Sequence, residues 1–301
     1  MRFVSKFKDQ ILLQLMVLPG IIFLIIFAYL PMAGLIIAFQ DFRIIKGFAG
    51  SPWVGLKQFE LMFTDPVFWL AVKNTVLLSL VNLGVGFFAP VILALSLNEI
   101  PFAKFKKIVQ TSSYLPYFIS WAVVASMWLT LLEPNGLINS ILIQLGLIQK
   151  PIGFWTQQDL FRPMAATVTI WKGAGWAAII YLAAISQVDQ ELYEAAMLDG
   201  AGRFARIFHI TLPALKPLIA ILFILNLGTL VRGNLDVSVL FGNPFNYQTS
   251  YIIEAYTLDL GFKLTRDSFA TAVGLVQSSF SLLLVIAANW AAAKFADTRL
   301  F

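Results

Sequence analysis

One short stretch of this sequence concentrates residue types that could do chemistry. Residues 194–213 read EAAMLDGAGRFARIFHITLP and hold two acids, two arginines, two glycines and the only histidine of the chain. Acids beside a histidine could serve acid–base catalysis, whereas the same residues on a short helical hairpin could bind another protein. A solvated hinge is the third interpretation. The stretch lies between two long apolar runs, so the elements around it decide among these functions.

The stretch and the residues before it predict two short helices joined by a glycine turn. QELYEAAMLDG contains good helix formers, and Gly200 and Gly202 can end a helix and reverse the chain. RFARIFHITL predicts a second helix that stops near Pro213. That helix would carry an apolar face and two neighbouring arginines: Phe204, Ile207 and Phe208, with Arg203 and Arg206. An apolar ridge edged by charge suits a groove on a partner, but a loop whose apolar residues touch lipid explains the pattern equally well.

The motifs of common enzymes are absent from the sequence. It has no G-x-x-x-x-G-K-[ST] phosphate loop, no H-E-x-x-H motif and no G-x-S-x-G nucleophile elbow. It has no cysteine and one histidine, which excludes disulfides, thiolate metal sites and multi-histidine metal sites. The sequence therefore predicts no catalytic residue, no metal site and no cofactor bound by this chain itself.

The composition is that of a membrane protein. Hydrophobic residues make up 59% of the 301 residues and charged residues 12%, whereas soluble domains have about 25% charged residues. A membrane-crossing helix needs about 20 mainly apolar residues. We therefore expect an all-α membrane protein, a single transmembrane domain over 1–301 with six transmembrane helices at about 11–39, 71–97, 108–132, 163–188, 215–235 and 269–292.

The positions of Lys and Arg predict the orientation. Basic residues are denser in one set of connecting segments than in the other: 1–10, 99–107, 189–216 and 293–301, against 39–73, 134–163 and 234–268. Because basic residues are enriched on the cytoplasmic side, both termini and the loop 189–214 are expected there. This bias accounts for the net charge of +5 without nucleic acid as a partner. Outside, an amphipathic helix at the lipid interface is expected from the spacing of Trp53, Leu56, Phe59, Met62 and Phe63.

Several polar or aromatic side chains fall inside the expected spans. A charge there costs about 2.5–3.5 kcal/mol, so it normally faces a cavity or a partner. Lys172 is expected in a cavity or snorkelling to the interface, and Arg232 in a cavity or paired with Asp236 four residues on. The other candidates could contact a sugar or pack between helices: Asn82, Asn226, Gln277 and Trp176.

The stretch 194–213 resembles the E-A-A-x-x-x-G-x(9)-I-x-L-P signature of permeases in binding-protein-dependent ABC importers. All seven fixed places are filled: Glu194, Ala195, Ala196, Gly200, Ile210, Leu212 and Pro213. Other stretches are similar to permeases of the maltose-type, complex-carbohydrate family: SPWVGLKQFELMF, FWLAVKNTVLLSL, FKKIVQTSSYLPYFISW, IWKGAGWAAIIYLAAI and SFATAVGLVQS. Within that family, the chain resembles a permease subunit of an alginate-oligosaccharide importer.

The resemblance implies a type I importer permease in the bacterial cytoplasmic (inner) membrane. It implies four partners besides lipid: a second homologous permease subunit, two cytoplasmic ATPase subunits that bind ATP and Mg, and a periplasmic substrate-binding protein. The ATPase would receive the coupling helix, which corresponds here to Glu194, Ala195, Ala196, Gly200, Arg203, Phe204, Ile207, Leu212 and Pro213.

The substrate expected from the resemblance is an oligosaccharide. Lys172 and Arg232, two cations with few anions in the spans, favour an acidic sugar such as an alginate fragment, although the stretch around Lys172 is similar to the family's whatever the sugar's charge. Acidic and neutral substrates both stay open. An ion-coupled secondary sugar transporter is the alternative function, but it would need carboxylates well inside the expected spans, where the sequence has none.

Overall fold

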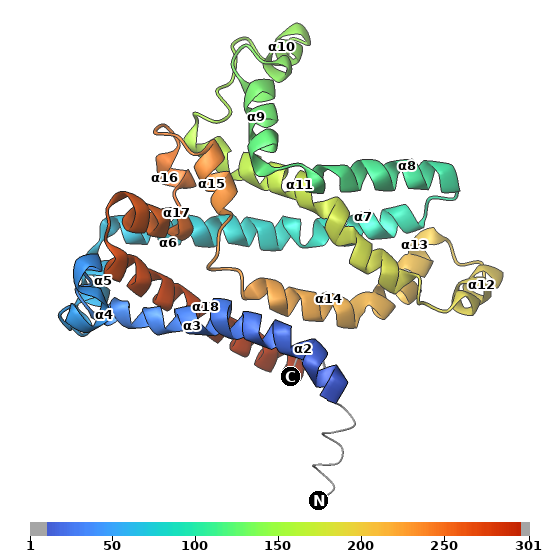
Figure 1. Cartoon of the computed structure of the whole chain (residues 1–301). Helices are drawn as coiled ribbons and strands as arrows, with labels where there is room; N and C mark the ends of the chain where they lie inside the picture. The colour runs from blue at the N-terminus through green and yellow to red at the C-terminus, as the bar shows by residue number, and fades with distance from the viewer. Residues whose placement is uncertain (1–10, 296–301) are drawn as a thin grey trace, which may run out of the picture. The chain divides into compact units, whose positions relative to one another are not determined.

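The computed structural model describes residues 11–295, which are helical apart from connecting loops and one bridge between Gln40 and Trp53 (Figure 1). The chain divides into two compact units, Met1–Asp65 with Thr257–Val276 and Pro66–Tyr256 with Gln277–Phe301. Helix α18 (Asp267–Phe295) runs through both units, so the single domain expected over 1–301 stays a prediction. The basic segment 1–10 and residues 296–301, which were used to predict the orientation, lie outside the described residues.

Within residues 11–295, five helical runs are long and apolar enough to cross a membrane: Leu13–Phe39, Pro66–Asn98, Gln158–Ile185, Arg203–Leu227 and Asp267–Ala291. A bent pair, Ala103–Phe118 with Trp121–Gln144, gives the sixth span when it is counted as one. The prediction of an all-helical membrane fold is therefore confirmed for the part of the chain described.

The described helices include regular α-helical segments, tighter 3-10 segments and wider π-helical segments. In the first unit they are α2 (Ile11–Leu24), η1 (Ile25–Tyr29), α3 (Leu30–Met32), η2 (Ala33–Phe39), η3 (Ile44–Lys46), α4 (Gly47–Gly50), α5 (Lys57–Thr64) and η7 (Asp259–Lys263). In the second they are α6 (Pro66–Val81), η4 (Asn82–Gly86), α7 (Phe88–Asn98), α8 (Ala103–Tyr114), η5 (Leu115–Phe118), α9 (Trp121–Leu132), α10 (Leu137–Gln144), α11 (Gln158–Ile185), α12 (Gln190–Leu198), α13 (Arg203–Arg206), η6 (Ile207–Thr211), α14 (Leu212–Leu227), α15 (Leu235–Phe241) and α16 (Tyr247–Ser250), while α17 (Ile253–Leu258) joins the two. The tighter 3-10 segments are η2, η3 and η5, and the wider π-helical segments are η1, η4, η6 and η7.

Three wide π-helical turns accommodate prolines inside the spans. The turns η1, η4 and η6 precede Pro31, Pro90 and Pro213. Proline has no N–H, and its ring clashes with the carbonyl four residues earlier. The residue four positions before each proline lies within the wide turn, and the turn moves the carbonyl of that residue away from the proline ring. The helix therefore continues past each proline.

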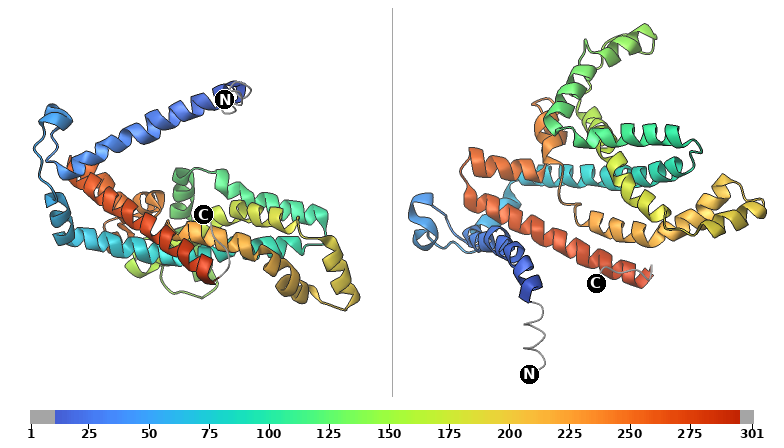
Figure 2. Two further views of the ribbon diagram at one scale, coloured as in Figure 1. Left: turned by 90° about the horizontal axis from the view of Figure 1, so that it is seen from below. Right: turned by 45° about the vertical axis from the view of Figure 1, so that its right-hand side comes forward.

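The third expected span, 108–132, is not one continuous helix. α8 and the short η5 are followed by α9, and the pair is bent by 105° (Figure 2). Pro116 lies in η5, and Ser120 caps α9 by accepting a hydrogen bond from the backbone N–H of Val123 at 3.4 Å. Local proline and capping chemistry therefore interrupts a run that is apolar enough to cross a membrane.

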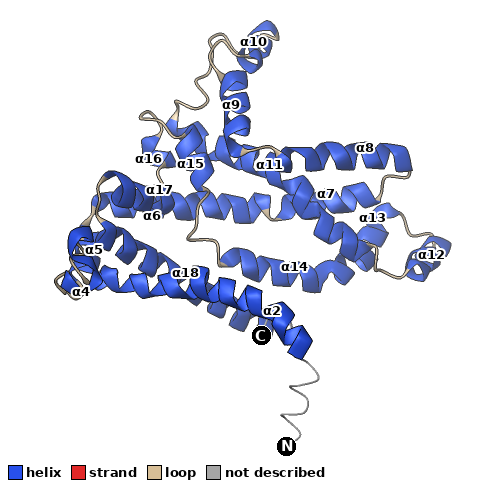
Figure 3. Cartoon of the chain, in the orientation of Figure 1, coloured by secondary structure: helices blue, strands red, loops and turns tan. Residues whose placement is uncertain are grey.

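The fifth expected span, 215–235, is shifted toward the N-terminus. Its helix begins at Arg203, passes Pro213 without stopping, and ends at Leu227. Residues 228–234 form an irregular connection before α15, visible as the loop between α14 and α15 (Figure 3). Asn234 caps α15 by accepting from the N–H of Val237 at 3.2 Å. The expectations that the helix stops near Pro213 and that the span reaches residue 235 are both wrong.

The amphipathic helix expected after the first span is shorter than the spacing suggested. α5 contains Phe59, Met62 and Phe63, but Trp53 lies outside it and pairs with Gln40. The Phe39 ring lies 5.9 Å from that of Trp53 and 5.3 Å from that of Phe59. Trp53 therefore belongs to an aromatic contact with the end of the first span.

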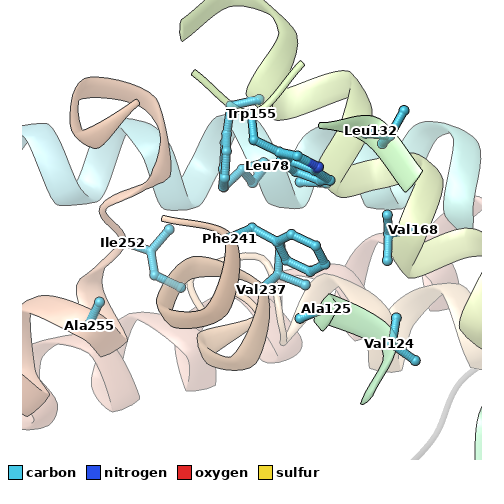
Figure 4. Close-up of a cluster of buried hydrophobic side chains, with 12 residues drawn as sticks. Leu78, Val124, Ala125, Leu132, Trp155, Val168, Val237, Phe241, Ile252 and Ala255 are labelled. Atoms are coloured by element: carbon cyan, nitrogen blue, oxygen red, sulfur yellow. The ribbon is translucent and has the colours of Figure 1, made fainter. Parts of the chain in front are cut away.

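Two apolar clusters hold the second unit together along α11. The first cluster joins α6, α9, α11, α15 and α17, and the rings of Trp155 and Phe241 stack in it at 4.3 Å (Figure 4). The second cluster joins α7, α11 and α14 through Val91, Ala178 and Leu215. These clusters fix α11 against α7 and α14, and those helices line the candidate site.

Candidate functional site

The hairpin of residues 189–211 has the predicted helix–glycine turn–helix form. The Asp189 side chain caps α12 by accepting from the N–H of Glu191 at 2.9 Å. At the other end, the N–H groups of Gly200 and Ala201 donate to the carbonyls of Met197 and Ala196, at 3.1 and 2.8 Å. Gly200 has φ of +80°, the left-handed conformation that this type of helix end requires and that glycine adopts without strain.

The hairpin exposes large apolar side chains. Leu198 is 90% exposed, Phe204 78% and Phe208 60%. The predicted coupling residues divide into two groups by burial: Glu194, Ala195, Gly200, Arg203, Phe204 and Pro213 are exposed, whereas Ala196, Ile207 and Leu212 are half-buried. Ile207 is thus less exposed than Phe204 and Phe208, which form the exposed part of the expected apolar face. Leu198 belongs to the exposed surface and was missed by sequence reasoning.

Two side-chain contacts hold the hairpin in place, one within it and one to the rest of its unit. The Tyr193 hydroxyl lies 2.9 Å from the Thr211 hydroxyl, which joins α12 to η6. Arg206 Nη2 lies 4.0 Å from Glu99 Oε2, and both side chains are about four-fifths buried. The arginines were expected as neighbours on one helix, but Arg206 turns toward the α7–α8 connection. No local pattern signals a pair separated by more than a hundred residues.

A second feature of this unit is a cavity of about 600 Å³ between α6, η4, α7, α11, α14 and the irregular residues 229–234. Most of its wall is apolar, and its members with polar side chains are Ser79, Asn82, Thr169, Tyr181, Asn226, Thr229, Arg232 and Asn234. Three of the predicted pathway residues are thus brought together: Asn82, Asn226 and Arg232. Ligand sites in membrane transporters are commonly formed where a helix is interrupted, as it is here.

The polar groups of this cavity differ in how far their hydrogen-bonding capacity is used. Arg232 is exposed, and within the described residues it forms no ion pair with Asp236, the pairing that was the alternative to a cavity position. The Asn82 carbonyl oxygen is buried without a partner in the part of the chain described. Asn226 donates to the carbonyl of Leu222 on its own helix at 2.8 Å. The cavity therefore presents one cation, the Arg232 guanidinium, while the Asn82 amide oxygen lies buried in its wall.

Lys172 does not line this cavity. It is 7% exposed, and its Nζ donates to the carbonyls of Pro116, Tyr117 and Ile119 at 3.3, 2.8 and 2.7 Å. The ammonium also lies 5.3 Å from the centre of the Trp121 ring. An ammonium group has three donors, and all three are used. Lys172 therefore holds the bend between η5 and α9, which replaces both the cavity and the snorkelling interpretations.

Trp176 and Gln277 also lie outside the cavity wall. The Trp176 ring stacks on Tyr117 at 4.7 Å and meets Phe118 edge-on at 5.4 Å. Gln277 donates from Nε2 to the carbonyl of Val231 at 2.7 Å and to Glu254 Oε1 at 2.9 Å. For both residues the structure supports the packing alternative over direct contact with a substrate.

The hairpin and the interrupted helices are those of a transport permease. Residues 86–297 match the family described as binding-protein-dependent transport system inner membrane component, and the chain belongs to this family. It is therefore a multi-pass permease subunit of an ABC importer, as the motif at 194–213 predicted.

Known relatives resemble the chain over nearly its whole length. It is 43% identical to the polygalacturonan/rhamnogalacturonan transport system permease protein YteP of Bacillus subtilis (strain 168), over 100% of this chain and 93% of the relative. The crystal structure of a bacterial ABC transporter involved in the import of the acidic polysaccharide alginate contains a chain that is 38% identical, with a TM-score of 0.90 and coverage of 98% and 99%. A bacterial alginate ABC transporter in complex with alginate pentasaccharide-bound periplasmic protein matches at 36% identity and a TM-score of 0.91, over 100% of both chains.

Proposed function

We propose that the chain forms half of the translocation pathway of an ATP-driven importer for oligosaccharides that carry carboxylate groups. The observation that carries this proposal is Arg232, which lines a cavity of about 600 Å³ and forms no ion pair within the part of the chain that the structure describes. A guanidinium can bind a carboxylate through two parallel hydrogen bonds, and such bonds are stronger where water is excluded. Asn226 and Thr229 offer amide and hydroxyl groups for sugar hydroxyls.

The comparisons support the same substrate class. YteP is named for polygalacturonan and rhamnogalacturonan, and the solved transporter imports an acidic polysaccharide. We extend this acidic class to the present chain because its cavity presents a cation of its own.

The partners follow from the hairpin and the family. A second homologous permease completes the pathway, two cytoplasmic ATPase subunits bind ATP and Mg, and a periplasmic protein delivers the sugar. The exposed residues of the hairpin dock into a groove on an ATPase subunit, with Phe204 and Leu198 as apolar anchors and Glu194 at the charged edge. ATP-driven closure of the ATPase pair then moves both hairpins, and the two helical bundles alternate access to the cavity.

The substrate proposal is tested on the reconstituted complex. Neutral and uronic oligosaccharides of equal length are compared as stimulators of ATP hydrolysis, each delivered by the binding protein. We expect stimulation by the uronic sugar at a concentration at least tenfold lower than by the neutral one. Stimulation by neutral sugars alone would overturn the acidic class.

The partner proposal is tested by co-purification with the ATPase. Glu194→Lys should reduce recovery of the ATPase subunit, because it reverses a charge on the exposed edge of the hairpin. Asp159→Lys is the matched control, since Asp159 is also exposed but begins α11 at the end opposite the hairpin. Equal recovery of the ATPase with both variants would show that Glu194 is not part of the interface. In a separate assay, sugar uptake by the isolated chain driven by a proton gradient would favour an ion-coupled transporter.

A further inference from the structure

The irregular residues 228–234 leave backbone polar groups without helical partners, and side chains from three other helices satisfy them. Ser281 donates to the Gly228 carbonyl, Gln277 donates to the Val231 carbonyl at 2.7 Å, and Ser79 donates to the Arg232 carbonyl at 3.0 Å. Unpaired backbone groups at membrane depth cost several kcal/mol each, so these bonds decide the shape of the connection.

Glu254 differs from the other three side chains because it accepts a hydrogen bond from the connection. Its Oε1 receives the N–H of Gly233 at 2.9 Å and the Nε2 of Gln277 at 2.9 Å. Its Oε2 is buried and has no partner among the described residues. The carboxyl group of Glu254 thereby joins α17 and α18 to the residue that follows Arg232.

These contacts hold the backbone on the C-terminal side of Arg232 at two successive groups. Its own carbonyl is held by Ser79, and the next N–H is held by Glu254. Gly233 packs closely against the segment that carries Glu254, because an added Cβ would lie 2.5 Å from Ile252 Cδ1 and 3.3 Å from Glu254 Oε2. With the backbone held at these two groups, the Arg232 side chain is directed to the cavity that it lines.

We propose that Glu254 and Gln277 are positioning residues that fix the direction of Arg232 and so set the recognition of anionic sugars. This proposal depends on the proposed function only for the role of Arg232 in binding a sugar carboxylate. Neither residue lines the cavity, so they act through the backbone of residues 231–233.

The position of residue 232 can be measured without any substrate. The chain has no cysteine, so a nitroxide attached to Arg232→Cys labels this position alone when the complex is assembled with cysteine-free variants of the partner subunits. We expect a restricted spectrum in the parent and in Glu254→Gln, whose amide oxygen accepts the same two bonds. Glu254→Leu removes the acceptor and should move more than half of the signal to a mobile component. An unchanged spectrum in Glu254→Leu would overturn the proposal.

Two further variants keep this measurement decisive. Glu133→Leu makes the same substitution at an exposed acid beyond the end of α9 and should leave the spectrum restricted; a mobile signal there would contradict a local effect of Glu254. Gln277→Leu retains the acceptor for Gly233 and should give an intermediate spectrum. If the Glu254→Leu complex does not assemble, Gln277→Leu decides, and a fully restricted signal in it overturns the proposal.

Substrate recognition is measured separately, by ATPase titration of unlabelled complexes that retain Arg232. Glu254→Leu should raise the half-saturating concentration of a uronic oligosaccharide about tenfold with the maximal ATPase rate retained, and Glu254→Gln should change it less than twofold. Loss of maximal rate with an unchanged half-saturating concentration would contradict a positioning role. A mobile label combined with no preference for uronic over neutral sugars would overturn the proposed substrate and would support the positioning of residue 232.

Discussion

Lys172 and Arg232 are both cations within or beside long apolar helices, yet their surroundings are opposite. The Lys172 ammonium is enclosed and donates to three carbonyls at the bend before α9. Arg232 is exposed in a cavity, and among the described residues hydrogen bonds hold its backbone and not its guanidinium. The comparison shows how to assign a role to a cation at membrane depth. If its N–H donors already contact protein groups, its role is structural; if they are free, it can recognise a substrate.

The largest effect is expected from Lys172→Met. Three carbonyls lose their donor, and each hydrogen bond contributes about 1 kcal/mol, so the variant should lose about 3 kcal/mol of stability. The measurement is the thermal unfolding temperature and the yield of the assembled complex. Lys216→Met is the matched control, because Lys216 is exposed on α14. Equal stability in both variants would show that Lys172 does not hold the bend.

Arg232→Met should leave stability unchanged and weaken recognition. Loss of a charge-assisted pair costs about 1.5–3 kcal/mol, so the half-saturating concentration of a uronic oligosaccharide should rise about 10- to 100-fold. Substrate-stimulated ATP hydrolysis by the reconstituted complex gives this value. A parallel loss for neutral sugars would assign Arg232 to structure, and the contrast with Lys172 would disappear.

Arg232→Lys should have a smaller effect of the same kind. Lysine keeps the charge but lacks the planar pair of donors that fits a carboxylate, so we expect a loss of about 1 kcal/mol, or about fivefold in half-saturating concentration. The same ATPase titration measures it. If Arg232→Lys is as impaired as Arg232→Met, the geometry of the guanidinium matters more than its charge.

The smallest effect is expected from Trp176→Leu. This removes the stack on Tyr117 beside the Lys172 bend, which is worth about 0.5–1.5 kcal/mol. The unfolding temperature should fall slightly, and the half-saturating concentration of the uronic sugar should stay the same. A selective loss of sugar response would return Trp176 to the substrate pathway.

The sequence alone predicted the fold class and the hairpin because both depend on local signals. Long apolar runs identify spanning helices whatever their neighbours, and Gly200 marks the reversal through its own backbone freedom. The break inside the third span and the earlier end of the fifth span were missed because apolar residues continue past both points. Composition reports that a segment is buried in lipid or protein, but it does not report whether its backbone stays helical.

The candidate site was predicted less completely because its contacts are long-range. Lys172 bonds carbonyls more than fifty residues earlier in the chain, and those bonds decided its role. Glu254 was missed because the short helix α17 lies in a segment that was assigned to an outer loop. Its contact with Gly233 depends on how α17 and α18 pack around the break, and no spacing in the sequence encodes that packing.

The wide turn η4 also changes the helical phase of the span that contains it. An α-helix repeats about every 3.6 residues, and the buried positions Ala71, Thr75 and Leu78 of α6 follow that repeat. Continued through an unbroken helix, the repeat would bury residues 89, 93 and 96. The buried residues of α7 are instead Val91, Ala94 and Leu97, with Pro90 beside them, about one position later. A single helical wheel drawn over Pro66–Asn98 would therefore place the buried residues of α7, including Pro90 of the cavity wall, on the wrong face of the helix.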